Sequence, residues 1–186
     1  MSGHSQPKNL YSINPEASTK ITVNKATDAL YIYEKTEEKA VVKFIDFALG
    51  NVSSPAVVTE KATKAPVLVG EKIVVTETAE EGKNVSFFAS GLKRVDIAEN
   101  LKDDSVKEEE GALLYIKDED DNGNGKLVIK TDSEKVIAEN VNSFYYKAPD
   151  KIFFVGLSEK AGWALYIYNG TEIHSIGANL TSVLTF

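Results

Sequence analysis

The residues with the clearest chemical potential form one acidic stretch, Asp118-Glu-Asp-Asp-Asn-Gly-Asn-Gly125. It carries oxygen-bearing side chains at every second position, namely Asp118, Asp120, Asn122 and Asn124. Alternating oxygen ligands with a glycine at the turn are typical of the first half of a calcium-binding loop. The glutamate expected at the twelfth position is missing, because Ile129 stands there. Two interpretations follow: a calcium site, or an acidic hairpin tip that uses Asn and Gly to turn.

Aromatic side chains form the second candidate site. Trp163, the only tryptophan, is followed at short spacing by Tyr166 and Tyr168. Rings of this kind combine a large apolar face with a polar group, so they can stack against a sugar ring. We therefore predict a ligand-binding platform at these three residues. The alternative is that strand aromatics at repeated positions fill the core between repeats.

The remaining polar clusters carry no catalytic pattern. The acidic run formed by Asp103, Asp104 and residues 108–110 reads as a solvated turn, and His174 has no Cys, His or serine motif beside it. The chain contains no nucleophile elbow, phosphate loop or dinucleotide fingerprint. We therefore expect no catalytic residues. A glycosidase is the third hypothesis, because the separation of two carboxylates is not visible in a sequence.

An internal repeat gives the elements that must position these residues. The segment Ile97-Ala-Glu-Asn100 recurs as Ile137-Ala-Glu-Asn140, and aligning them brings Asn179 into register, so that these asparagines stand 40 and 39 residues apart. A period of this size indicates a solenoid, a propeller or an array. Each asparagine follows a strand, which predicts a turn between repeats.

Four repeat units nearly fill the chain. Their approximate bounds are 9–52, 64–101, 102–141 and 142–180, with residues 1–8 as a disordered tail and 181–186 as a closing strand. Each unit reads as four short strands, and Leu30-Tyr-Ile-Tyr33 repeats Leu165-Tyr-Ile-Tyr168 letter for letter. The segment 53–65 is an insertion, expected as a loop or an extra edge strand. We expect residues 9–186 to form one domain.

The strands predict an all-β fold and, more specifically, a β-propeller of about four blades. Runs such as residues 113–116 and 152–155 are apolar at consecutive positions, so both faces of their sheets must be covered. Four-stranded sheets stacked around an axis provide that cover. Residues 182–186 are expected to pair near residues 10–23 and close the ring. The alternatives are a β-trefoil with an N-terminal extension and an incomplete ring that closes by dimerisation.

The repeat resembles uncharacterised β-propeller repeats in exported proteins of Gram-positive bacteria. These repeats have the order YY, KIYY, LY, a turn with Gly, and IA-x-N-V. The matching letters here are Tyr145-Tyr146, Lys151-Ile-Phe-Phe154, Leu165-Tyr166, Asn169-Gly170 and Ile137-Ala-Glu-Asn-Val141. The resemblance covers residues 66–186 well and residues 10–52 poorly. The resemblance implies a noncatalytic surface or binding role.

Composition limits the partners. The net charge is −7 with a pI near 5.0, and Arg94 is the only arginine, so nucleic acid is not an expected partner. There is no cysteine and no apolar run long enough to span a membrane. Residues 1–7 lack the regions of a signal peptide. If they were added to an excised domain, we expect an extracellular or cell-surface location.

These observations predict a noncatalytic binding or scaffold module without a required cofactor. Its loops would contact a protein partner, on a bacterial surface or in a phage-like appendage. The alternative is a carbohydrate-binding, lectin-like domain that uses Trp163, Tyr166 and Tyr168, with calcium at residues 118–124 in a supporting role. The sequence predicts no oligomeric state.

Overall fold

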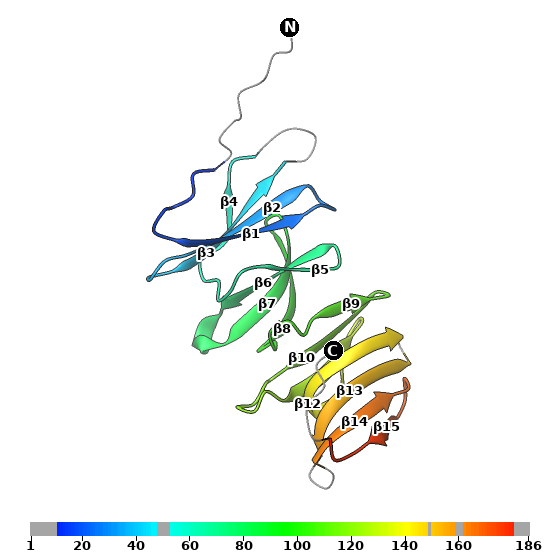
Figure 1. Ribbon diagram of the computed structural model, residues 1–186. Helices are drawn as coiled ribbons and strands as arrows, with labels where there is room; N and C mark the ends of the chain where they lie inside the picture. The colour runs from blue at the N-terminus through cyan, green and yellow to red at the C-terminus, as the bar shows by residue number, and fades with distance from the viewer. Residues whose placement is uncertain (1–10, 48–52, 149, 159–161, 181–186) are drawn as a thin grey trace. The chain divides into compact units, whose positions relative to one another are not determined.

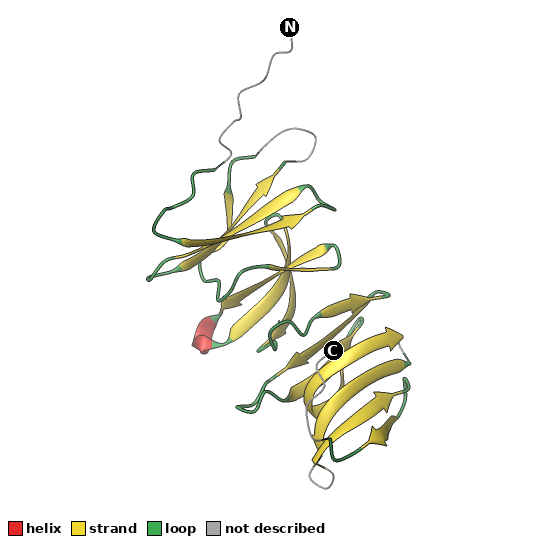
Figure 2. Ribbon diagram, in the orientation of Figure 1, coloured by secondary structure: helices red, strands yellow, loops and turns green. Residues whose placement is uncertain are grey.

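The protein is an all-β protein built from antiparallel sheets. A computed structural model describes residues 11–47, 53–148, 150–158 and 162–180, and Figures 1 and 2 show its strands. Apart from one 3₁₀ turn at Glu80–Gly82, every regular element in these ranges is a strand. Within the same ranges, no helix has the length and apolar character needed to cross a bilayer. The all-β fold predicted from the sequence is confirmed.

The chain divides into two compact units, Met1–Ile97 and Ala98–Phe186, where the sequence suggested one domain. Unit 1 contains two antiparallel four-stranded sheets in simple sequential order. The first sheet consists of β1 (Ser18–Asn24), β2 (Ala29–Lys35), β3 (Ala40–Asp46) and β4 (Ala56–Thr59). The second consists of β5 (Val67–Val69), β6 (Lys72–Thr78), β7 (Asn84–Ser90) and β8 (Lys93–Glu99), whose end passes the unit boundary.

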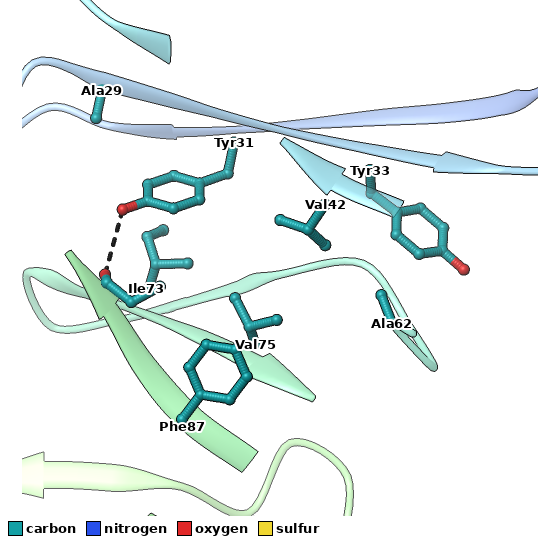
Figure 3. Packing of buried hydrophobic residues seen from close by; sticks show 9 residues of the cluster. Ala29, Tyr31, Tyr33, Val42, Ala62, Ile73, Val75 and Phe87 are labelled. Atoms are coloured by element: carbon teal, nitrogen blue, oxygen red, sulfur yellow. Dashed lines mark hydrogen bonds between the residues drawn. The ribbon is translucent and has the colours of Figure 1, made fainter. Parts of the chain in front are cut away.

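The two sheets of unit 1 share one apolar core. Alternate residues of β2, Tyr31 and Tyr33, lie in one cluster with Ile73, Val75 and Phe87 of the second sheet, and Figure 3 shows Tyr31 pointing toward Ile73. The Tyr31 side chain is 1% exposed, and its hydroxyl donates a hydrogen bond of 3.2 Å to the Ala89 carbonyl. The other face of β2 is also buried, at Ile32, which explains why the sequence of this strand is apolar at consecutive positions.

Unit 2 is formed by one seven-stranded antiparallel sheet that curves like half of a barrel (Figure 1). Its strands in order are β9 (Lys107–Glu109), β10 (Ala112–Lys117), β11 (Gly125–Lys130), β12 (Glu134–Ala148), β13 (Lys151–Ser158), β14 (Gly162–Tyr168) and β15 (Ile173–Gly177). The long strand β12 pairs with β11 through its first half and with β13 through its second half. Thus one strand joins two of the predicted repeat units.

The two halves of this sheet enclose the core of unit 2. Leu114, Leu127 and Ile137 from the first half pack in one cluster with Ile152 and Phe154 from the second. Leu114, Leu127 and Ile152 are fully buried. The strong curvature of the sheet is what allows one of its faces to supply both sides of a core.

The recurring asparagines have a conformational explanation. Asn100, Asn140 and Asn179 have φ values of 48°, 55° and 57°, which place all three in the left-handed region. Asparagine enters this region more readily than most residues. Asn100 lies between β8 and β9, Asn140 lies where the pairing of β12 changes from β11 to β13, and Asn179 follows β15. The repeated asparagine therefore marks the junction between repeats, but the predicted turn is wrong at Asn140, where strand β12 continues and only its pairing partner changes.

The first predicted unit needs a correction in its alignment. Leu30–Tyr33 lies in β2, the second strand of its sheet, whereas Leu165–Tyr168 lies in β14, the third strand of its repeat. Both are inner strands of their sheets, so the same apolar letters suit both positions. The fourth strand of the first sheet, β4, lies in the insertion 53–65 and is an edge strand. Of the two structures expected for this segment, a loop or an extra edge strand, the second is observed.

The finer parts of the architecture stay predictions. The proposed tail (residues 1–8) and the closing strand (residues 181–186) lie outside the described residues. Closure into a four-bladed propeller depends on them. What the structure shows is the coarser statement: four sequential groups of antiparallel strands, the last two joined through β12.

Candidate functional site

The predicted calcium loop forms the hairpin between β10 and β11. The Asp120 carboxylate accepts hydrogen bonds of 2.9 Å from the backbone N–H groups of Asn122 and Asn124. These backbone hydrogen bonds, with the one from Asn124 first, hold the pKa of Asp120 below its usual value. Asp118, with φ of 55°, begins the turn. Asp120 thus closes the loop as a turn residue usually does.

Lysine side chains surround the same loop. The Lys126 ammonium lies 3.1 Å from the Asp118 carboxylate, and the Lys102 ammonium lies 3.1 Å from that of Glu119. Lys102 also donates hydrogen bonds to the carbonyls of Gly123 and Asn142. The buried Asn124 Oδ1 makes no hydrogen bond to any described residue. Across the described part of the chain, no three His, Cys, Asp or Glu side chains converge on a metal-sized site.

We expect calcium to leave the stability of this loop unchanged, because protein groups already engage Asp118 and Asp120. The melting temperature should be the same in millimolar calcium and in chelator. A ligand that binds only the folded state raises the melting temperature, and the rise grows with the logarithm of the ligand concentration above its dissociation constant. A calcium-dependent rise that is lost in Asp120→Asn would therefore contradict this expectation and assign the loop as a metal site.

The three predicted aromatic residues do not share one face of the sheet. Successive side chains of a strand point to opposite faces, and β14 pairs with β13 without a bulge. Tyr166 and Tyr168 therefore face the core of unit 2, where Tyr166 stacks on Phe154 at 5.2 Å between ring centroids. Trp163 lies on the opposite face and is half-buried. The structure brings Tyr166 and Tyr168 together and separates Trp163 from them.

Tyr168 lines an open cleft at the ends of three hairpins, which we call the unit-2 cleft. Its volume is about 430 Å³, and its walls are Ile129, Thr131, Ser133, Lys135, Asp150, Tyr168 and Gly170. The Lys135 ammonium donates a hydrogen bond of 2.9 Å to the Tyr168 hydroxyl. That hydroxyl donates in turn to the Gly170 carbonyl. These contacts fix the lysine and the tyrosine against each other.

The unit-2 cleft can hold a polar, uncharged ligand. It offers an ammonium donor at Lys135, a carboxylate acceptor at Asp150, and hydroxyls at Thr131 and Ser133 that both donate and accept. Ligand sites combine such a small set of polar groups with apolar or aromatic walls. Sequence reasoning found only Tyr168, because the other residues come from separate turns that share no short motif.

Comparisons with known proteins assign no family. No protein-family model matches the chain, and no curated protein matches it. A chain in a structure described as a nidogen/laminin complex is 12% identical, with 87% of this chain and 65% of that chain covered and a TM-score of 0.45. An acylaminoacyl peptidase from Pyrococcus horikoshii is 13% identical, with 80% and 30% covered and a TM-score of 0.49. Likenesses at these scores carry no argument about fold or activity.

Proposed function

We propose that this protein is a noncatalytic binding module that holds its ligand with the turns at the ends of its strands. The observation that carries the proposal is the unit-2 cleft, in which three hairpins bring Lys135, Asp150 and Tyr168 together. Asp150 is the single carboxylate in its walls. A glycosidase uses two carboxylates across the scissile bond, so the cleft supports binding better than hydrolysis.

Of the partners expected from the sequence, the cleft supports a glycan best. One lysine and one aspartate balance each other in charge, which suits a neutral ligand rich in hydroxyl groups. Each sugar hydroxyl both donates and accepts hydrogen bonds, as do Thr131 and Ser133. The propeller ring, and a place on a bacterial surface or phage-like appendage, belong to the same proposal, since rigid rings present turns to a partner.

A glycan array with the labelled full chain tests this function, and we expect saccharide hits that persist in chelator. The hit is then titrated into ¹⁵N-labelled protein, where the Gly170 amide signal should shift because Gly170 lines the cleft. Silence across the array, or shifts that avoid Gly170, would reject the function. Trp163 fluorescence is a useful contrast: Trp163 is not among the cleft walls, so we expect little response.

A protein partner is the second candidate, and strand β15 favours it. This strand lies at the end of its sheet, and no described strand pairs with its outer side. Ile173 and Ile176 on it are 43% and 53% exposed. Exposed edges of this kind accept an added strand from a partner. Cross-linked pull-downs that lose their partner in Ile176→Lys would support this candidate.

A further inference from the structure

A second cleft in unit 1 has the same chemical make-up as the unit-2 cleft. This unit-1 cleft has a volume of about 480 Å³, against about 430 Å³ for the other. Its polar and aromatic walls are Thr27, Phe44, Asp46, Ser90 and Lys93. The corresponding walls of the unit-2 cleft are Thr131, Ser133, Lys135, Asp150 and Tyr168. Each set contains two aliphatic hydroxyls, one carboxylate, one lysine and one aromatic ring, and the ring in unit 2 carries a third hydroxyl.

The two clefts are also built from the same kinds of turn. In unit 1, the turn between the third and fourth strands of one sheet (residues 90–93) faces Thr27, in the first turn of the other sheet. In unit 2, the turn between β11 and β12 faces Asp150, in the turn between β12 and β13. Each cleft thus lies between two successive repeats. The likeness is one of position and chemistry, because the residues do not recur in the same chain order.

A glycine lines each cleft, Gly91 in unit 1 and Gly170 in unit 2. At Gly91, a Cβ atom would lie 3.2 Å from Cζ of the Phe44 ring, so glycine gives the ring room. At Gly170, a Cβ atom would lie 3.6 Å from Cα and Cβ of Asp150. Both glycines have positive φ, 61° and 94°. The two sites therefore share a left-handed glycine beside the ring or the carboxylate that would contact a ligand.

We propose that the two clefts are duplicate binding sites, so that one chain binds the same neutral saccharide twice. The proposal rests on the function proposed above and adds to it the site in unit 1 and the number of sites. In each cleft, the lysine donates to sugar hydroxyls and the aspartate accepts from them. In unit 1 the half-buried Phe44 ring lies along the apolar edge of the sugar, whereas in unit 2 the buried Tyr168 orients Lys135 through its hydroxyl. Two sites on one chain bind a multivalent glycan surface more tightly than a single sugar through effective concentration.

The test is an NMR titration of the ¹⁵N-labelled full chain with methyl glycosides of glucose, galactose, mannose and N-acetylglucosamine. We expect one of these probes to shift the amide signals of both Gly91 and Gly170. Lys93→Ala should remove the Gly91 response and keep that of Gly170, and Lys135→Ala should do the reverse. Lys20→Ala, at an exposed lysine outside both clefts, is the matched control and should keep both responses.

A surface assay gives the second readout. Retention on a surface coated with the active saccharide should fall about 100-fold in either single variant, because avidity between two linked sites is typically 10²–10⁴. A response at Gly170 alone, or different glycosides at the two clefts, overturns the duplication and leaves the binding function in place. A response at neither cleft overturns both proposals. Unchanged melting temperatures of the variants show that lost binding is not lost folding.

Discussion

Replacing Gly125 with alanine is expected to destabilise unit 2 by roughly 1–3 kcal/mol, the usual cost of overpacking a filled core. A Cβ atom at this position would lie 2.5 Å from the Lys117 carbonyl oxygen and 2.8 Å from Cγ2 of Ile116. The oxygen belongs to the backbone of β10, which is paired with β11, so it cannot move away without disturbing that pairing. Gly125 also pairs with Val141, beside the point where β12 changes partner.

Denaturant unfolding followed by tryptophan fluorescence measures the loss of stability in unit 2. Trp163 is the only tryptophan, and it lies in unit 2. The matched control is Gly177→Ala in β15, where an added Cβ has no neighbour within 4 Å. This variant should stay within about 0.5 kcal/mol of the parent protein, as surface changes usually do. If the two variants had equal unfolding midpoints, the close approach of the Lys117 carbonyl to position 125 would not limit the side chain there.

The local pattern of the chain predicts its strands well. The repeat of about 40 residues placed four groups of strands, and consecutive apolar letters identified β10 and β13 as strands buried on both faces, where Tyr115 and Val155 are fully buried. The asparagine positions were predicted as turns, which is right for Asn100, between β8 and β9, and wrong for Asn140, which lies inside β12 with the same left-handed φ. These features depend on neighbours in sequence, so they can be read from it.

The clefts could not be predicted in this way. Lys135, Asp150 and Tyr168 meet only because three hairpins end at the same place, and sequence spacing does not tell which turns face each other. The alternation along β14 could have separated Trp163 from Tyr168, because an odd spacing in a regular strand places two side chains on opposite faces. The sequence reading grouped them by residue type instead. The acidic spacing at residues 118–124 likewise does not show that the Asp120 carboxylate accepts hydrogen bonds from backbone N–H groups of the same loop.

Removing the Tyr31 hydroxyl, as Tyr31→Phe, is expected to destabilise unit 1 by about 1–3 kcal/mol, the cost of leaving buried polar groups unpaired. The hydroxyl accepts a hydrogen bond of 2.9 Å from the Gly91 N–H and donates one of 3.2 Å to the Ala89 carbonyl. Burial raises the pKa of Tyr31, and the hydrogen bond from Gly91 opposes that shift. The link joins two sheets through residues 60 positions apart.

Hydrogen exchange of the Gly91 amide is the most direct measurement, because that N–H loses its acceptor in the variant. We expect exchange to become roughly tenfold faster or more, since 1.4 kcal/mol corresponds to a factor of ten. Tyr33→Phe is the matched control: Tyr33 lies in the same core, but no hydrogen bond of its hydroxyl is found among the described residues. If the Gly91 amide exchanged at the same rate in both variants, Tyr31 would contribute to the core through its ring alone.

The Tyr31→Phe variant also has a consequence for binding, because Gly91 forms a wall of the unit-1 cleft. A loosened Gly91 should therefore weaken saccharide binding at that cleft while the Gly170 response stays unchanged.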